Sequence, residues 1–496
     1  MSAPTQYVIG VDMGTQGVRG IAVTSDGTVL ARASVPLPPH TLAPTAESIF
    51  EQDAQDWWRV TYVMLGQLGE QLAAANIPVE AGVALCISGT SGTFVPLDAT
   101  HRPLRPALMY SDSRAVDEAA RCNEALSALT QRMGYRFNAS FALPKLLWLA
   151  THEPHTWART ALVAHQADYL VGQLTDVWRV SDYANVLKTG YDLLDERYPE
   201  AIAQVLNLSL ECFPRAVASA TPLGYLLPSL ASALRLGPQL LVVAGTTDGC
   251  ASQFAAGAIE PGEWVSSLGT TLTIKGVSTQ LITDIQGRVY CHRHPGQGWL
   301  PGGASNTGGE VLAQRFPAAD LAAYDKRAAR LVPTALLSYP LMRRGERFPF
   351  VAPRAEGFVI GLGSEAEAAA QADISYAAAL EGVALLERLA YDVVADLGAT
   401  VSGPIRTVGG ATRSSLWLNI RASVCNRPFI VPLVSDPAMG AAVLAASARL
   451  HPDIHHATRA MIRSSLEVLP EPSWVPVYEE RYACFKEELY KRGYIS

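Results

Sequence analysis

A chain of 496 residues exceeds what a single hydrophobic core serves, so two or more domains are expected. Hydrophobic residues make up 49% of the chain and charged residues 17%, a balance typical of packed globular proteins and unlike that of disordered chains. The formal net charge of −7, without clusters of Lys and Arg, excludes the basic footprint of a nucleic-acid-binding protein. We therefore expect a packed multidomain protein with no nucleic-acid partner.

The cysteines and the N-terminus indicate the cellular compartment. Seven cysteines are scattered along the chain and form no CxxC pair, which disfavours a disulfide framework or a zinc knuckle. The first residues, MSAPTQYVIGVD, contain no basic region followed by an apolar one, so no secretory signal is predicted. The longest charge-free segment, between Arg215 and Arg235, contains two prolines and favours loop and core over a membrane span. We expect a cytoplasmic location and no membrane partner.

In chain order, residues 7–35 contain the first clear pattern. They alternate apolar and polar positions between the turns MGTQG and SDG, which predicts a three-stranded antiparallel meander. Helical spacing follows over residues 52–77. Residues 82–98, GVALCISGTSGTFVPLD, predict a buried strand that runs into a loop.

The second half of the chain repeats the opening motif. Glu263–Ser278, EWVSSLGTTLTIKGVS, again predicts strand, Gly-Thr turn and strand, which suggests an internal duplication with one hairpin in each domain. A boundary is expected near Gly257–Glu263, which divides the chain into domains 1–256 and 257–496. A long amphipathic helix is predicted over Ile374–Ala399, followed by a strand, a glycine turn and another helix. Strands that alternate with long helices predict an α/β fold.

Three glycine turns are natural anion sites, because turns and helix starts expose free backbone N–H groups. They are Gly14-Thr15-Gln16, Gly269-Thr270-Thr271 and Gly409-Gly410-Ala411. None matches the P-loop pattern GxxxxGK[ST], and no GxGxxG with a following acid supports a nicotinamide-binding domain. Each turn taken alone is more often plain turn chemistry than a phosphate site.

Two carboxylates stand beside such turns. Asp12 closes the first strand just before its glycine turn, a position that suits a group meeting Mg²⁺-bound water. Asp248 follows the apolar run Leu240–Ala244 and the sequence GTT. A turn-capping role is an equally weighted alternative for each acid. The sequence GTSG around Ser91 does not match GxSxG, which argues against a hydrolase nucleophile.

Four segments together resemble one family. GVDMGTQGVRGIAV, SGTSGTFVPLD, TTDGCASQFAAGAIEPGEWVSSLGTTLTI and VGGATRSSLWLNIRASVCNRPF occur in the order found in FGGY-type carbohydrate kinases. The resemblance covers nearly the whole chain. It implies two ribonuclease-H-like domains of the actin/hexokinase/Hsp70 superfamily, with sugar and ATP bound in the cleft between them. Residues 165–172 and 181–201 look most like the plant and cyanobacterial D-ribulokinase branch, a xylulokinase-like group of pentulose kinases.

The resemblance assigns roles by position. Asp248 matches the catalytic base, and Asp12 matches the acid beside Mg²⁺ and the transferred phosphoryl group; both would contact the sugar. Thr90 and Ser91 fall in the sugar loop. The positions that match ATP-binding residues are Gly14, Thr15, Gln16, Gly269, Thr270, Thr271, Gly308, Gly410, Ala411 and Ser414.

The sugar loop separates this chain from ordinary members of the family. Xylulokinases carry Gly-Gln-Met-His-Gly there, whereas this chain has short hydroxyl side chains, and the Arg-Glu pair of glycerol kinases is also missing. The resemblance therefore implies ATP- and Mg²⁺-dependent phosphorylation of a ketopentose, with D-ribulose favoured. The alternatives are a xylulokinase, a kinase for another ketose or polyol, and more remotely a non-catalytic sugar sensor or an ATP-driven chaperone or phosphatase of the superfamily. Dimers are frequent among similar kinases, so a homodimer is an open expectation.

Overall fold

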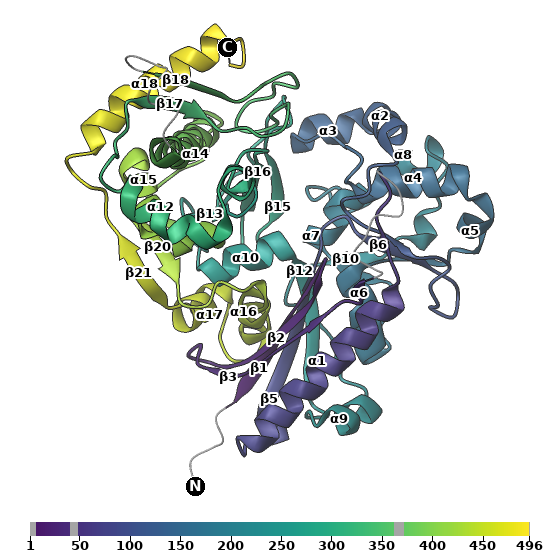
Figure 1. Ribbon diagram of the computed structural model, residues 1–496. Helices are drawn as coiled ribbons and strands as arrows, with labels where there is room; N and C mark the ends of the chain where they lie inside the picture. Colours follow the sequence, from purple (N-terminus) through teal and green to yellow (C-terminus); the bar gives the residue numbers. More distant parts are fainter. Residues whose placement is uncertain (1–5, 40–47, 362–371, 496) are drawn as a thin grey trace. The chain divides into compact units, whose positions relative to one another are not determined.

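The computed structural model describes residues 6–39, 48–361 and 372–495, and Figure 1 shows the course of the chain. The chain forms two compact units. The first unit combines Met1–Ile259 with His292–Gln297 and Asp436–Ile462. The second unit combines Glu260–Cys291, Gly298–Ser435 and Arg463–Ser496.

These units are not continuous in sequence, unlike the expected domains 1–256 and 257–496. The long N-terminal part of the first unit ends at Ile259, within the stretch where we expected a boundary. Helices α16 (Pro437–Arg449) and α17 (Ile454–Met461) then return to the first unit, because α16 packs against strands of its sheet and α17 packs beside α16. The assignment of sugar to one domain and nucleotide to the other remains a prediction.

The main sheet of the first unit has six strands in the order β11-β12-β5-β1-β2-β3. Strands β1, β2 and β3 form the antiparallel meander predicted from residues 7–35, which is confirmed. Strands β1 and β12 both run parallel to β5, and β11 is antiparallel to β12. The bounds are β1 (Tyr7–Gly14), β2 (Gly17–Thr24), β3 (Val29–Pro36), β5 (Gly82–Gly89), β11 (Pro222–Tyr225) and β12 (Leu241–Thr247).

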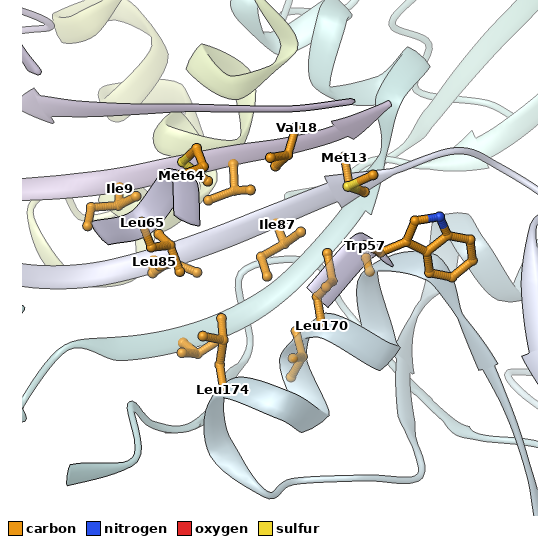
Figure 2. Close-up of a cluster of buried hydrophobic side chains, with 14 of the residues drawn as sticks. Ile9, Met13, Val18, Trp57, Met64, Leu65, Leu85, Ile87, Leu170 and Leu174 are labelled. Atoms are coloured by element: carbon orange, nitrogen blue, oxygen red, sulfur yellow. The ribbon is translucent and has the colours of Figure 1, made fainter. Parts of the chain in front are cut away.

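The core of the first unit lies between this sheet and two helices, α1 (Ala54–Ala74) and α6 (Gln166–Thr175). Apolar side chains from all three sources meet there, and Figure 2 shows Ile9, Met13, Val18, Trp57, Met64, Leu65, Leu85, Ile87, Leu170 and Leu174. Side chains alternate between the faces of a strand. Ile9 and Val11 join this core while Gly10 faces Ala438, so α16 covers the opposite face.

Smaller elements complete the first unit. A four-stranded sheet in the order β4-β7-β6-β8 and a two-stranded parallel pair, β9 and β10, accompany the main sheet. The strand bounds are β4 (Glu51–Gln52), β6 (Phe94–Leu97), β7 (Ala107–Leu108), β8 (Leu162–His165), β9 (Val180–Asp182) and β10 (Arg215–Val217). The helices are α2 (Val116–Ala125), α3 (Ser127–Met133), α4 (Ala142–His152), α5 (Pro154–Arg159), α7 (Tyr183–Val186), α8 (Ala201–Gln204), α9 (Pro228–Leu234) and α10 (Asp248–Ala256).

The sheet of the second unit repeats the pairing pattern of the first. Its order is β15-β16-β14-β13-β19-β20-β21, with the hairpin β13–β14 next to the parallel pairs β13–β19 and β19–β20. Strands β21, β20, β19, β13, β14 and β16 thus correspond to β11, β12, β5, β1, β2 and β3, which confirms the predicted duplication. The bounds are β13 (Trp264–Leu268), β14 (Leu272–Gly276), β15 (Tyr290–Arg293), β16 (Trp299–Ala304), β19 (Ile405–Val408), β20 (Phe429–Pro432) and β21 (Ser464–Val468).

A long helix, α14 (Ala372–Asp396), lies where the amphipathic pattern of Ile374–Ala399 predicted one. From Tyr376 to Glu387 every residue is buried, so this middle part of the helix is enclosed on all sides rather than on one face. The remaining elements are α11 (Glu310–Arg315), α12 (Leu321–Ala328), β17 (Leu336–Tyr339), β18 (Phe358–Gly361), α15 (Ser415–Cys425) and α18 (Val475–Lys491). In the described ranges of both units, no helix is long and apolar enough to cross a membrane.

Candidate active site

Two acids lie at one edge of the first unit's main sheet. Asp12 is near the carboxyl end of β1, paired in register with Ser88 of β5. Asp248 is the first residue of α10, directly after β12, whose Thr247 pairs with Gly89 of β5. Because β1 and β12 are both parallel to β5, their carboxyl ends share an edge and bring the two acids close together.

Burial makes the charge of Asp12 costly. The residue is 5% exposed, and burial together with the charge of Asp248 raises its pKa to about 7. The hydroxyl of Ser88 donates a hydrogen bond of 2.8 Å to Oδ1 of Asp12 and partly opposes this rise. Asp436, the N-cap of α16, adds a further negative charge, while Arg19 lowers the pKa. The carboxylate is therefore placed where a cation would stabilise it.

Asp248 is half-buried at the start of α10. Its Oδ1 accepts a 2.6 Å hydrogen bond from the N–H of Gly249. This contact joins adjacent residues and does not cap α10, because Thr247 occupies the N-cap position and makes no side-chain cap hydrogen bond. The start of the helix nevertheless favours a negative charge at Asp248. Neither feature accounts for the proximity of Asp12, which comes from tertiary folding.

The sugar loop that follows β5 is held by a relay of hydrogen bonds. The N–H of Tyr110 donates to Oγ1 of Thr93 at 3.0 Å, and the hydroxyls of Thr93 and Thr90 are 2.7 Å apart. The Thr90 hydroxyl donates in turn to Oε1 of Gln166 at 2.8 Å. Thr90 is 2% exposed, so its hydroxyl serves the shape of the loop. Oγ of Ser91, by contrast, has no hydrogen-bond partner among the described residues.

Two lysines that the sequence did not single out hold the same loop. Lys145 is fully buried on α4, and its Nζ donates to the carbonyls of Gly92 at 2.9 Å, Met109 at 2.6 Å and Ser140 at 3.4 Å. Burial lowers the pKa of Lys145 well below its ordinary value. Lys188 reaches the carbonyl of Ser91 at 3.4 Å. These contacts span 53 and 97 residues of sequence, so no local pattern predicts them.

The first glycine turn, Gly14-Thr15-Gln16, joins β1 to β2. The carbonyl of Thr15 accepts from Nε2 of Gln52 at 2.9 Å, and the carbonyl of Gln16 accepts from the N–H of Leu37 at 2.9 Å. A Cβ atom added to Gly14 would lie 3.5 Å from the nearest other atom, which is ordinary contact. Protein packing therefore does not by itself require glycine at this position.

In the second unit, the structure brings the other two turns and Gly308 together. The carbonyls of Gly269 and Thr270 accept hydrogen bonds from the N–H groups of Gly309 at 2.8 Å and Glu310 at 3.0 Å. A Cβ on Gly308 would lie 2.5 Å from the Thr271 backbone, whereas one on Gly269 would have nothing within 4 Å. A Cβ on Gly409 would lie 2.5 Å from the carbonyl oxygen of Leu268, which places the third turn beside the same hairpin.

The third turn continues as a short 3-10 helix, Gly410–Arg413, and α15 begins after it. Gly410 is exposed and Ala411 is 5% exposed. The hydroxyl of Ser414 caps α15 by accepting from the N–H of Trp417 at 3.0 Å. The helix thus begins several residues later than the sequence predicted, and Ser414 has a structural partner.

The first unit offers Mg²⁺ a suitable carboxylate. Mg²⁺ is usually bound by one or two carboxylates together with phosphate oxygens and waters. Asp12 fits this role because it is surrounded by acids whose charges a cation would offset. No three His, Cys, Asp or Glu side chains in the described part of the chain gather into a metal cluster.

The chain has clear relatives among sugar kinases. It matches the N-terminal domain of the FGGY family of carbohydrate kinases over residues 7–255 and the C-terminal domain over residues 264–449. A xylulose kinase from Streptomyces coelicolor is 30% identical over 451 residues, which are 90% of this chain and 88% of the relative. The xylulose kinase of Escherichia coli is 29% identical over 512 residues, 98% of each chain.

A solved structure agrees in fold. The crystal structure of xylulose kinase from Rhodospirillum rubrum matches with a TM-score of 0.87 at 27% identity, covering 98% of this chain and 99% of that one. The duplicated sheets and these matches define a two-domain α/β sugar-kinase fold of the actin/hexokinase/Hsp70 type. The chain belongs to the FGGY family of carbohydrate kinases, and it is a phosphotransferase with a sugar and ATP as substrates.

Proposed function

We propose that this kinase transfers the γ-phosphoryl group of ATP to a hydroxyl of a ketopentose, with D-ribulose as the favoured substrate. The observation that carries the proposal is the close approach of Asp12 and Asp248 at one sheet edge, where the charge of one raises the pKa of the other. Such perturbed acids are typical of functional sites.

In this proposal, Asp248 orients the sugar hydroxyl and takes its proton as the bond to phosphorus forms. Phosphoryl transfer demands little covalent chemistry from the protein, so positioning and charge stabilisation supply most of the rate enhancement. A positioned base contributes about 10²–10⁴-fold. The start of α10 also fixes the direction of the Asp248 side chain through the N–H of Gly249.

The nucleotide phosphates would be held by backbone N–H groups at the glycine turns, since glycine lets the backbone approach an anion closely. The open side of Gly269 supports this role in the second unit. The proposed contacts are Gly14, Thr15, Gln16, Gly269, Thr270, Thr271, Gly308, Gly410, Ala411 and Ser414. Asp12 would anchor Mg²⁺, which when bound neutralises charge on the phosphate oxygens.

For the sugar, we propose Ser91 as a direct hydroxyl contact and Thr90 as the residue that shapes the loop around it. Ser91 supports this because its Oγ has no partner among the described residues, and the Thr90 hydroxyl is already engaged with Gln166. The short hydroxyl side chains favour D-ribulose. D-xylulose is the second candidate, because relatives over nearly the whole chain are named xylulose kinases.

ADP release measured across a panel of sugars tests this function. The panel needs D-ribulose, D-xylulose, L-ribulose, D-gluconate and glycerol, each with Mg²⁺ and ATP. We expect the highest kcat/KM with D-ribulose and the next highest with D-xylulose. A preference for gluconate or glycerol over both ketopentoses would contradict the proposed substrate class.

A further inference from the structure

A buried carboxylate in the second unit, Glu346, is the centre of a hydrogen-bond cluster beside the Gly269–Thr271 hairpin. Glu346 is 3% exposed and accepts hydrogen bonds from five donors. Its Oε1 accepts from the backbone N–H groups of Asn306 at 2.7 Å and Arg347 at 3.0 Å. Its Oε2 accepts from the hydroxyls of Ser305 at 2.8 Å, Thr307 at 2.9 Å and Tyr339 at 3.0 Å.

Three of these donors belong to one loop, residues 305–309, which connects β16 to α11. The neighbours of Glu346 hold the same loop: Nδ2 of Asn306 donates to the carbonyl of Gly345 at 2.9 Å, and Nε of Arg347 donates to the carbonyl of Ala304 at 2.8 Å. The segment Gly345–Arg347 therefore holds the loop by hydrogen bonds at Ser305, Asn306 and Thr307 and at Ala304 just before it.

The clamped loop in turn packs against the hairpin Gly269–Thr271. The N–H of Leu272 donates to the carbonyl of Thr307 at 2.9 Å, and the N–H of Ser305 donates to the carbonyl of Leu272 at 2.9 Å. Gly308 is the point of closest approach to Thr271, where a Cβ atom would lie 2.5 Å away. The position of the hairpin thus depends on the loop, and the loop depends on Glu346.

We propose that Glu346 is a positioning residue for nucleotide binding, which fixes the loop 305–309 and through it the Gly269–Thr271 hairpin. This inference rests on the proposed function, in which that hairpin holds ATP phosphates. Glu346 itself would not touch the nucleotide. A buried carboxylate with five donors is a strong anchor, because hydrogen bonds to a charged group exceed those between neutral groups.

The chemistry of the cluster predicts a graded series of variants. Glu346→Gln keeps one carbonyl oxygen for the two backbone N–H groups, which cannot reverse their direction, while hydroxyls can rotate to accept from its amide. Glu346→Asp is shorter by one methylene and cannot reach both sets of donors. Glu346→Ala leaves all five donors without the carboxylate. Affinity for nucleotide should fall in the order wild type, Gln, Asp, Ala.

Glu381 on α14 provides a matched control in the same unit. It is 2% exposed and accepts from the N–H and hydroxyl of Thr334 at 2.9 and 2.6 Å and from the hydroxyl of Tyr478 at 2.9 Å. Glu381 is therefore also a buried carboxylate with several hydrogen bonds. None of these hydrogen bonds involves residues 305–309 or 269–271. Glu381→Gln should disturb the stability of the unit without changing the affinity for nucleotide.

The experiment titrates MgADP into each full-length variant by calorimetry, and circular dichroism checks that each variant is folded. Steady-state kinetics then give the KM values for MgATP and for the best sugar. We expect Glu346→Ala to raise the Kd for MgADP about tenfold or more, and Glu346→Gln about threefold, near the worth of one hydrogen bond. The Kd of Glu381→Gln should stay within about twofold of wild type, and the KM for the sugar should not change.

Distinct outcomes separate this inference from the proposed function. If the folded wild type does not bind MgADP, the proposed function fails. If wild type binds but folded Glu346 variants bind equally well, or if Glu381→Gln weakens binding as much as Glu346→Gln, the positioning role is wrong. Should Glu346→Ala not fold, the Gln and Asp variants carry the same decision.

Discussion

The two units repeat one sheet topology but present different groups at the equivalent hairpin. In the first unit Asp12 stands two residues before Gly14 and is paired with Ser88 of the neighbouring parallel strand. In the second unit the residue two before Gly269 is Ser267, paired with Val408. Only the first copy therefore has an acid at this position. Both copies have a Gly-Thr hairpin at this place, but only the first adds a buried carboxylate beside it.

This difference has a physical consequence for stability. Burying a carboxylate beside other acids is costly, as the raised pKa of Asp12 indicates, and such strain is commonly retained for function. A hairpin that binds through its backbone has no such cost, but it needs the space that a missing side chain leaves. The first unit should therefore be sensitive to changes of charge, and the second to changes of shape.

The largest expected effect is on catalysis. Asp248→Asn removes the proton acceptor but keeps an oxygen for the N–H of Gly249, so kcat should fall about 10²–10⁴-fold while the Kd for the sugar changes little. Steady-state kinetics and calorimetric titration of the sugar measure both quantities. Asp453→Asn is the control, because Asp453 caps α17 in the same unit by accepting from the N–H of His456. If Asp248→Asn keeps most of the wild-type kcat, or if both variants lose activity equally, the assignment of Asp248 as the base is wrong.

The next effect concerns shape in the second unit. Gly269→Ala adds a methyl group where nothing in the protein lies within 4 Å, so the fold should be unchanged. The methyl group would keep the phosphate away from the backbone, so the KM for MgATP should rise about tenfold. Gly66→Ala on α1, where the nearest atom is 3.9 Å away, is the matched control in the first unit. An unchanged KM for MgATP in Gly269→Ala would show that the hairpin does not approach the nucleotide.

A smaller expected effect is the pH dependence of the stability of the first unit. His294, in the short segment that belongs to the first unit, is 3% exposed, and burial and the nearby His455 lower its pKa to about 4. The unfolded chain, with an ordinary pKa near 6.5, binds the proton first, so stability is lost as pH falls from about 6.5 towards 4. At pH 5.5 the loss from this group is on the order of 1 kcal/mol.

His294→Gln cannot titrate and should remove this part of the pH dependence from the first unit's unfolding transition. Differential scanning calorimetry at pH 7.5, 6.5 and 5.5 measures it for both proteins. Equal slopes of stability against pH in wild type and variant would contradict the assignment to His294.

Local patterns predicted much of the fold and part of the site. The meander of residues 7–35, the second hairpin and the long helix α14 follow from periodicity and turn residues that lie within a few positions of one another. Asp12 was identifiable because it stands just before the turn Gly14-Thr15-Gln16, and Asp248 because it follows an apolar run and the sequence Gly-Thr-Thr. The family resemblance then predicted the two-domain architecture, which the matches over residues 7–255 and 264–449 confirm.

Contacts between distant segments could not be predicted in this way. The return of α16 and α17 to the first unit joins residues separated by most of the chain. Lys145 holds Gly92 across 53 residues, and Glu346 holds Ser305 across 41. Nothing in the sequence identifies the partners of Lys145 or Glu346, because these are carbonyls, hydroxyls and backbone N–H groups that only folding brings near. Charged residues are seldom fully buried, so their default prediction is exposure.

The fate of the γ-phosphoryl group decides whether the protein is a ketopentose kinase. The wild-type enzyme is incubated with γ-labelled ATP, Mg²⁺ and a ketopentose, and the label is followed into sugar phosphate and inorganic phosphate. We expect the label to appear in a pentulose phosphate, its formation to depend on the sugar, and release of inorganic phosphate to be slow. Label released mainly as inorganic phosphate at a rate independent of the sugar would contradict this expectation and indicate an ATPase instead.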